Sequence, residues 1–182
     1  IGHLSPEFAK KTGLSTDVEI LVGAHDSNAN LYRYKAAGLA NYTILSTGTW
    51  MIGFNRGRSL GDFREDRAMV ANVDVDGEPI ASTLTMTGRE YFILAGDHPV
   101  SDERAFDMVE ALIARGTMPI PSFVEDPGPV PHSGGKGHVV GPPPESDEER
   151  GALASLYAAS VANLCLDVLG STTPIVIDAG FA

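Results

Sequence analysis

The chain has 182 residues, and its content of 43% hydrophobic and 20% charged residues allows a packed core and argues against global disorder. The net charge of −11 disfavours binding to nucleic-acid backbones or anionic membrane surfaces, because both need clustered Lys and Arg. A single cysteine excludes a disulfide framework and a Cys-based zinc site and fits a reducing cytosol, so we expect a cytoplasmic protein with no nucleic-acid or membrane partner.

The first part of the chain alternates helical and strand patterns. Apolar spacing and turn residues predict two helices, each followed by a glycine that favours a helix end, and three strands, the first of them buried. The helices are expected over residues 5–12 and Ser27–Ala37, and the strands over Glu19–Val22, Thr43–Leu45 and Met51–Phe54.

The rest of the chain predicts a hairpin, three helices and a last strand. The pair Asp76-Gly77 between two alternating segments is a strong hairpin signal. Residues 117–144, rich in Pro and Gly, indicate an irregular covering segment, of which 125–144 is either a lid or passive covering. The hairpin strands are expected over Met69–Val75 and Pro79–Thr83, the helices over Gly88–Leu94, Asp102–Ala114 (capped by Ser101) and Glu145–Leu169, and the last strand over Pro174–Ile177. This alternation predicts a mixed α/β sheet.

Asp26 is the first candidate for chemistry. It follows an apolar strand at the start of a helix, where the backbone would hold a carboxylate in place to accept the proton of a substrate hydroxyl. Capping the helix is the plainer role for an Asp at this place. His25 could hydrogen-bond a substrate or Asp26, or be purely structural. No second His or carboxylate lies at metal-ligand spacing, so no metal site is expected within this chain.

The turn Ser46-Thr47-Gly48-Thr49 is the second candidate. Its glycine permits close approach of a ligand to the backbone, and its hydroxyls and N–H groups are of the kind that bind phosphate. An ordinary turn at the end of a strand is the alternative. Asp26 and this turn together suggest phosphoryl transfer to an alcohol, provided that both open onto a common crevice.

Other motifs give weaker evidence of a ligand-binding site. Arg89 and Glu90 follow Gly88 at a predicted helix start, and a surface ion pair is favoured over a nucleotide contact. The segment Gly134-Gly135-Lys136-Gly137 is not a Walker loop, because it lacks the first glycine at the required spacing and the Ser or Thr after Lys136. No strand is followed by the glycine pattern of a dinucleotide site.

Five segments, taken in order, resemble the FGGY family of carbohydrate kinases over essentially the whole chain. They are Gly23-Ala-His-Asp-Ser-Asn-Ala, Leu45-Ser-Thr-Gly-Thr-Trp, Thr87-Gly-Arg-Glu-Tyr, Leu164-Cys-Leu-Asp-Val-Leu-Gly and Ile175-Val-Ile-Asp-Ala-Gly-Phe-Ala. The first two are most similar to the branch that contains rhamnulokinases and fuculokinases.

The resemblance implies an α/β fold of the ribonuclease H-like type shared by actin, hexokinase and the Hsp70 chaperones. The fold would be incomplete, with residues 1–38 as the last strand and helix of the first domain and 39–182 as most of the second. It also implies ATP and Mg²⁺ as cofactors and a sugar as the substrate, with the Mg²⁺ ligands outside this chain.

The resemblance further implies roles for individual residues. Asp26 would be the general base and would bind the sugar together with His25, three residues would lie against the ATP phosphates, and two would line the nucleotide site. The phosphate residues are Thr47, Gly48 and Thr49, and the nucleotide residues are Gly88 and Gly180. The segment Asp178-Ala-Gly departs from the Gly-Gly that the family usually has, because Ala179 has a Cβ and lacks the conformational freedom of glycine, which leaves the adenine contact open.

Three functions follow as alternatives. The parent protein phosphorylates a ketose or deoxyketose, and the isolated chain is then expected to be inactive. Alternatively, the chain belongs to a catalytically silent module that binds sugar or nucleotide on the same scaffold. In the third, weaker alternative a hydrolase uses Asp26 and His25 on water. The oligomeric state stays open, with a homo-oligomer as one option.

Overall fold

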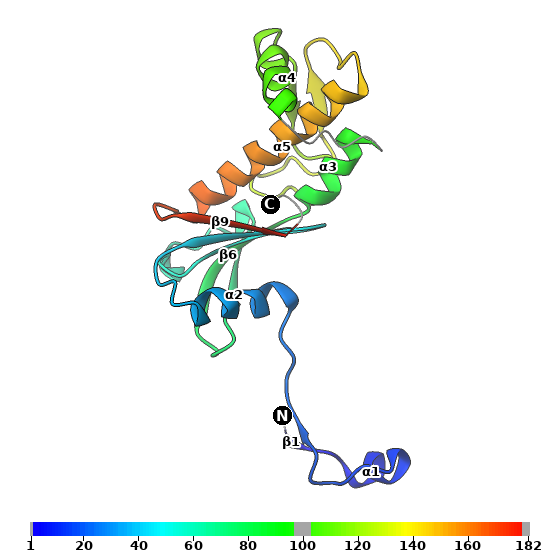
Figure 1. Cartoon of the computed structure of the whole chain (residues 1–182), viewed down its shortest axis with the longest axis vertical. Coiled ribbons are helices and arrows are strands. Elements are labelled where there is room, and N and C mark those ends of the chain that lie inside the picture. Colours follow the sequence, from blue (N-terminus) through cyan, green and yellow to red (C-terminus); the bar gives the residue numbers. More distant parts are fainter. Residues whose placement is uncertain (1, 97–102, 180–182) are drawn as a thin grey trace.

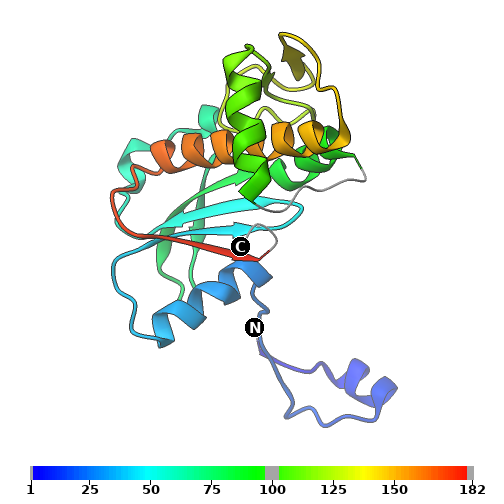
Figure 2. The ribbon, with the colours of Figure 1, turned by 45° about the horizontal axis from the view of Figure 1, so that its top comes forward.

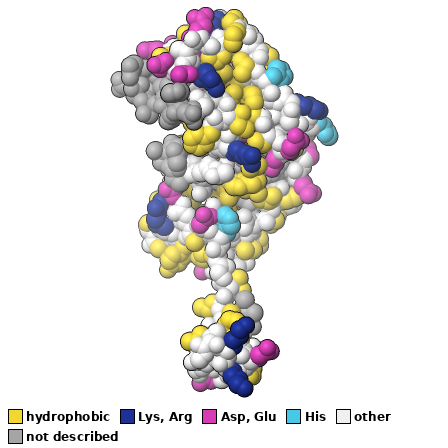
Figure 3. Space-filling model, turned by 90° about the vertical axis from the view of Figure 1, so that its right-hand side faces the viewer, with side chains coloured by type: hydrophobic (Ala, Val, Ile, Leu, Met, Phe, Trp, Pro, Cys, Tyr) yellow, Lys and Arg dark blue, Asp and Glu magenta, His cyan; other side chains and the backbone are white. Residues whose placement is uncertain are grey.

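The computed structural model describes residues 2–96 and 103–179. A narrow N-terminal segment projects from a broader body that begins near residue 25 (Figures 1 and 3). The segment contains three short elements: β1 (Gly2–His3), α1 (Pro6–Thr12) and β2 (Glu19–Ile20). The predicted helix at 5–12 is confirmed, because Ser5 caps its start and Gly13, at φ 75°, ends it.

The prediction of a buried strand over Glu19–Val22 is wrong. The strand stops at Ile20, and Leu21 and Val22 are exposed. Within the described residues, β2 pairs with β1 alone, and this two-stranded sheet has no second layer that would cover Leu21 and Val22. Apolar strands are buried only where helices or sheets lie on both faces.

The body is built on a five-stranded sheet with the order β5-β6-β4-β3-β9. Neighbours among the first four strands are antiparallel, whereas β9 lies parallel to β3. The strands are β3 (Thr43–Thr47), β4 (Met51–Asn55), β5 (Met69–Val73), β6 (Pro79–Thr85) and β9 (Ile175–Ala179). The predicted mixed sheet and the hairpin around Gly77, at φ 81°, are confirmed.

Helices cover both faces of this sheet (Figure 2). On one face lies α2 (Asp26–Ala36), whose Leu31 packs with Ile44, Phe54 and Ile80 of three strands. On the other face lie α3 (Thr87–Ala95) and α5 (Asp147–Val168), which form a core cluster with Met51. A further helix, α4 (Glu103–Ala114), packs on α5. The predicted Ser101 cap of α4 lies outside the described residues.

The long helix α5 lies at the centre of the helical layer that covers the α3 face of the sheet. By length and composition alone it could cross a membrane, yet half of its apolar window is buried inside the body. Tyr157, Val161 and Cys165 pack in the core that α5 shares with α3 and the sheet. Burial within the fold therefore accounts for its apolar character.

The segment predicted to be irregular and the loop after β4 both contain short regular elements. Residues 117–144 form a small antiparallel pair, β7 (Met118–Ile120) and β8 (His138–Val140). The loop after β4 contains two 3₁₀ turns, η1 (Leu60–Asp62) and η2 (Glu65–Arg67). Pro and Gly lower local strand propensity, so the pairing of β7 with β8 comes from their packing over α5 rather than from local sequence.

Candidate active site

A pocket of about 900 Å³ lies between the first half of α2 and the carboxyl end of β3. Residues 25–27, 29 and 30, at the start of α2, form one side, and residues 46–50, at the end of β3 and in the turn after it, form the other. Ile52 and Leu84 also line the pocket. The two predicted turns therefore open onto one pocket. Ligands of open α/β sheets commonly bind at such carboxyl ends of strands.

Asp26 is the first residue of α2, and its side chain is 90% exposed at the pocket. Its Oδ1 accepts a hydrogen bond of 2.7 Å from the backbone N–H of Ser27. The capping position itself belongs to His25, so the simple capping role predicted for Asp26 is replaced by a place in the first turn, where the helix dipole favours a carboxylate. The carboxylate is thus held by the helix and open to a ligand.

His25 lies beside this carboxylate. Its Nδ1 is 2.8 Å from Oδ1 of Asp26 and 3.4 Å from the backbone N of Ser27. With the proton on Nδ1 the imidazole donates to Asp26, whereas the other tautomer accepts from Ser27. The structure therefore brings His25 and Asp26 together, and the imidazole can orient the carboxylate.

The turn after β3 presents a buried and an exposed part. Thr47 is buried, and its hydroxyl donates to the backbone oxygen of Asp178 at 2.7 Å. The N–H of Gly48 donates to the carbonyl of Trp50 at 2.9 Å, which closes the turn. Gly48, Thr49 and Trp50 are exposed and line the pocket. A phosphate in the pocket would therefore meet the exposed backbone and the Thr49 hydroxyl, while the Thr47 hydroxyl holds β9.

Gly88 lies behind the turn rather than among the pocket-lining residues. A Cβ at this position would lie 1.7 Å from the carbonyl oxygen of Gly48 and 3.1 Å from Cα of Thr49. The N–H of Arg89 donates to the Thr49 carbonyl at 3.2 Å. The first turn of α3 therefore supports the turn at 48–49 from behind, and this contact depends on a glycine.

Asp178, which the sequence marked only as a departure from the family pattern, connects the two sides of the pocket. Its Oδ2 accepts hydrogen bonds from Asn30 and, at 2.7 Å, from Arg33, both on α2. The hydrogen bond of Arg33 to Tyr34, and then the one to Asp178, raise the pKa of the Arg33 guanidinium above its ordinary value. Gly180, the predicted adenosine contact, lies outside the described residues.

The predicted surface pair of Arg89 and Glu90 is wrong. Glu90 is buried, and its carboxylate accepts hydrogen bonds from the Ser122 hydroxyl and, at 2.8 Å, from the N–H of Phe123. Burial, and then the charge of Glu90, raise the pKa of Tyr157 well above its ordinary value. Because these partners lie in distant segments, local sequence carried no sign of this role.

No group of three or more His, Cys, Asp or Glu side chains in the described part of the chain is arranged to hold a metal ion.

A sequence model of the C-terminal domain of carbohydrate kinase FGGY matches residues 39–182. The chain belongs to the FGGY carbohydrate kinase family. Kinases of this family use ATP, and the chain has the α/β fold of their C-terminal domain. Family membership therefore agrees with the resemblance found in the sequence.

Solved structures give the extent of the match to FGGY kinases. A carbohydrate kinase from Novosphingobium aromaticivorans is 37% identical, with a TM-score of 0.74, and the match covers 98% of this chain and 41% of that chain. Xylulose kinases from Bifidobacterium adolescentis and Rhodospirillum rubrum share the fold at 16% and 22% identity, with TM-scores of 0.56 and 0.50. Those matches cover 92% and 93% of this chain and 35% and 36% of the xylulose kinases. No curated protein matches the chain significantly.

Proposed function

We propose that the whole protein that carries this chain transfers the γ-phosphoryl group of ATP to a hydroxyl of a ketose or deoxyketose. The observation that supports this most directly is the pocket shared by Asp26 and the turn at 47–49. In-line phosphoryl transfer to an alcohol needs a base at the acceptor hydroxyl and donors at the phosphate, and the two sides of the pocket offer one of each.

Each side of the pocket has its own part in the reaction. Asp26 accepts the proton of the sugar hydroxyl, and His25 keeps the carboxylate turned toward it. Gly48 gives the phosphates close access to the turn and the hydroxyl of Thr49 donates to them, with the turn supported from behind by Gly88. When bound, ATP supplies the phosphoryl group and Mg²⁺ screens its charge, with Mg²⁺ ligands expected outside this chain.

We also propose that the chain spans the boundary between two kinase domains. Residues 1–38 would be the end of the first domain and 39–182 most of the second, with Gly180 at the adenosine. The family match, which begins at residue 39, supports this boundary. The exposed apolar side chains of Leu21 and Val22 also support it, since the missing part of a first domain would cover them.

Replacing the carboxylate tests the proposed base. Asp26→Asn in the whole protein is expected to lower kcat by about 10²–10⁴, the range for loss of a general base, with a small change in KM. Steady-state kinetics with ATP and a panel of ketoses and deoxyketoses measure both constants. Asp62→Asn, an exposed carboxylate outside the pocket, is the matched control and should keep full activity.

The outcome separates the kinase from its alternatives. Unchanged turnover in Asp26→Asn would remove Asp26 from the chemistry. Sugar or nucleotide binding without turnover in the unaltered protein would point to a silent binding module, and phosphate release that ignores the sugar would point to a hydrolase. A preference for deoxyketoses would support the rhamnulokinase and fuculokinase branch.

A further inference from the structure

Asp178 bonds to both sides of the pocket from the end of β9. Its backbone oxygen accepts the hydroxyl of Thr47 at 2.7 Å, at the start of the turn that we assign to phosphate. Its carboxylate accepts hydrogen bonds from Arg33, at 2.7 Å, and from Asn30, both on the helix that begins with Asp26. One residue therefore contacts the phosphate side through its backbone and the base side through its side chain.

The spacing of these partners puts them on one face of α2. Asn30 and Arg33 follow Asp26 by four and seven residues, which places all three on the same side of a helix. Asn30 itself lines the pocket. A shift of Asp178 would therefore move the helix face that carries Asp26.

The other contacts of α2 are made with the core of the sheet and with β5. Leu31 packs into the sheet core, and Asn28 donates to Asn72 at 2.7 Å and to the carbonyl of Val73 at 2.6 Å, both on β5. These contacts hold the helix toward the far edge of the sheet. Asp178 holds it toward β9, at the opposite edge of the described sheet.

We propose that Asp178 is a positioning residue that keeps Asp26 in register with the turn at 47–49. This inference rests on the proposed function. The family match begins at residue 39, so Asp178 ties α2, which precedes the matched domain, to the last described strand of that domain. The Asp178 side chain is 20% exposed and that of Arg33 is 61% exposed, so solvent partly screens their charge-assisted pair, whereas the hydrogen bond from Asn30 is partly buried.

Kinetics of the whole protein test the proposal. Asp178→Ala is expected to lower kcat by about tenfold to a hundredfold, the cost of a misplaced reacting group, while KM for ATP changes less. Asp178→Asn keeps an acceptor for Asn30 and should restore part of the rate. The matched control is Lys35→Ala on the same helix, which removes an ion pair with Asp76 on the hairpin and should leave kcat unchanged.

Hydrogen–deuterium exchange gives a readout that does not need activity. In Asp178→Ala, the amides of residues 29–33 should exchange faster than in the unaltered protein, and in Lys35→Ala they should not. The double variant Arg33→Ala with Asp178→Ala should lose no more rate than the single variants, because residues of one network are not additive.

The proposal and the proposed function fail in different ways. An inactive unaltered protein would overturn the kinase assignment, and the exchange experiment would still decide whether Asp178 holds α2. A normal kcat with normal exchange in Asp178→Ala would overturn the positioning role. A lowered kcat with unchanged exchange and an additive Arg33→Ala effect would overturn it too. If Asp178→Ala fails to fold, Asp178→Asn is judged by the same criteria.

Discussion

Gly88 shows at the residue scale how an absent side chain shapes the site. The turn at 48–49 lies so close to α3 that a Cβ at position 88 would overlap the carbonyl oxygen of Gly48. By contrast, a Cβ at Gly48 would find its nearest neighbour, the carbonyl oxygen of Trp50, at an ordinary 3.8 Å. The two glycines therefore differ, because Gly88 is required for packing, whereas Gly48 leaves open space for the ligand that we propose.

Substituting both glycines separates these needs. Gly88→Ala is expected to lower the free energy of unfolding by about 1–3 kcal/mol, the usual cost of overpacking, and to weaken ATP binding by displacing the turn. Gly48→Ala should keep the melting temperature and weaken ATP binding alone. Thermal unfolding and calorimetric titration measure the two effects, and a normal melting temperature in Gly88→Ala would contradict the close packing.

Sequence alone identified residues whose role lies in a local motif. Asp26, His25 and the turn at 47–49 were found as candidates, and the structure brings them to one pocket. The sequence could not show that the Thr47 hydroxyl donates to the backbone oxygen of Asp178, because these residues are 131 positions apart. The burial of Glu90 was missed for the same reason. Partners from distant segments decide which polar groups are available to a ligand.

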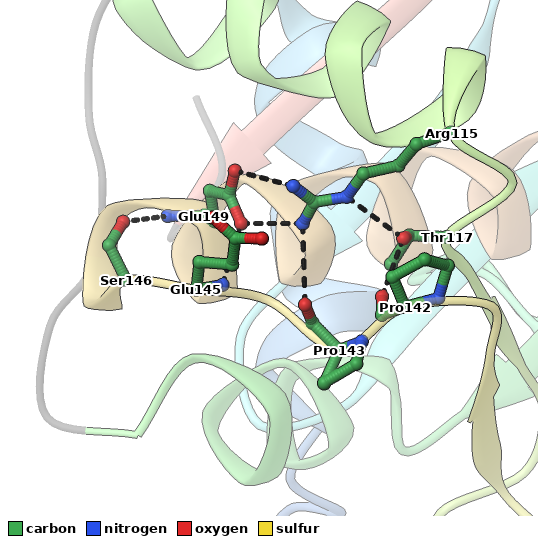
Figure 4. Close-up of polar contacts among 7 residues, drawn as sticks. All are labelled: Arg115, Thr117, Pro142, Pro143, Glu145, Ser146 and Glu149. Carbon is green, nitrogen blue, oxygen red and sulfur yellow. Dashed lines mark hydrogen bonds and ion pairs between the residues drawn. The ribbon is translucent and has the colours of Figure 1, made fainter.

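At the scale of single elements, the start of α5 is fixed by an ion pair with the segment after α4 (Figure 4). Arg115 binds both carboxylate oxygens of Glu149, at 3.0 and 2.5 Å, and donates to Thr117 at 3.1 Å. The same carboxylate accepts the N–H of Glu145 at 2.7 Å, while Ser146 caps the helix. The hydrogen bond from Arg115 is the main cause that lowers the pKa of Glu149 below 4.5.

This lowered pKa predicts a pH-dependent stability. The ionised form of Glu149 favours the folded state, so its contribution is complete above pH 4.5 and is lost as the pH falls through the lower folded-state pKa. Glu149→Gln should therefore cost about 1–3 kcal/mol at neutral pH, and the difference should shrink below pH 4.5. Urea unfolding from pH 3 to 7 measures this. Asp167→Asn, an exposed carboxylate on the same helix, is the control, and a difference that does not change with pH would contradict the ion-pair account.

Elements with a strong local signal were predicted well. The Asp76-Gly77 hairpin and the long helix predicted over Glu145–Leu169 are confirmed, because turn chemistry and helical periodicity act over a few residues. The pairing of β7 with β8 joins segments separated by Pro-rich chain, so no local pattern marked it. The burial expected for Glu19–Val22 was wrong because burial depends on neighbouring layers.

At the scale of the whole molecule, the chain divides into a covered body and an uncovered N-terminal segment. Every residue from 10 to 26 is exposed, whereas the sheet of the body has helices on both faces (Figure 2). Exposed segments with few contacts open locally at little cost in free energy and are the first to be cleaved.

Limited proteolysis of the 182-residue chain tests this division. Chymotrypsin is expected to cut first after Leu14 or Leu21, and to leave a resistant product that contains the sheet. Mass spectrometry of the early products identifies the sites, and digestion in urea, where cleavage should spread over the chain, is the control. A first cut within β3 to β6 would contradict the stability assigned to the body.

Trp50 adds a practical consequence. It is the chain's sole tryptophan, and it lines the pocket between Asp26 and the turn. Its indole emission therefore comes from one place, so quenching or a spectral shift on adding a nucleotide or a sugar would report occupancy there without a dye or an engineered label.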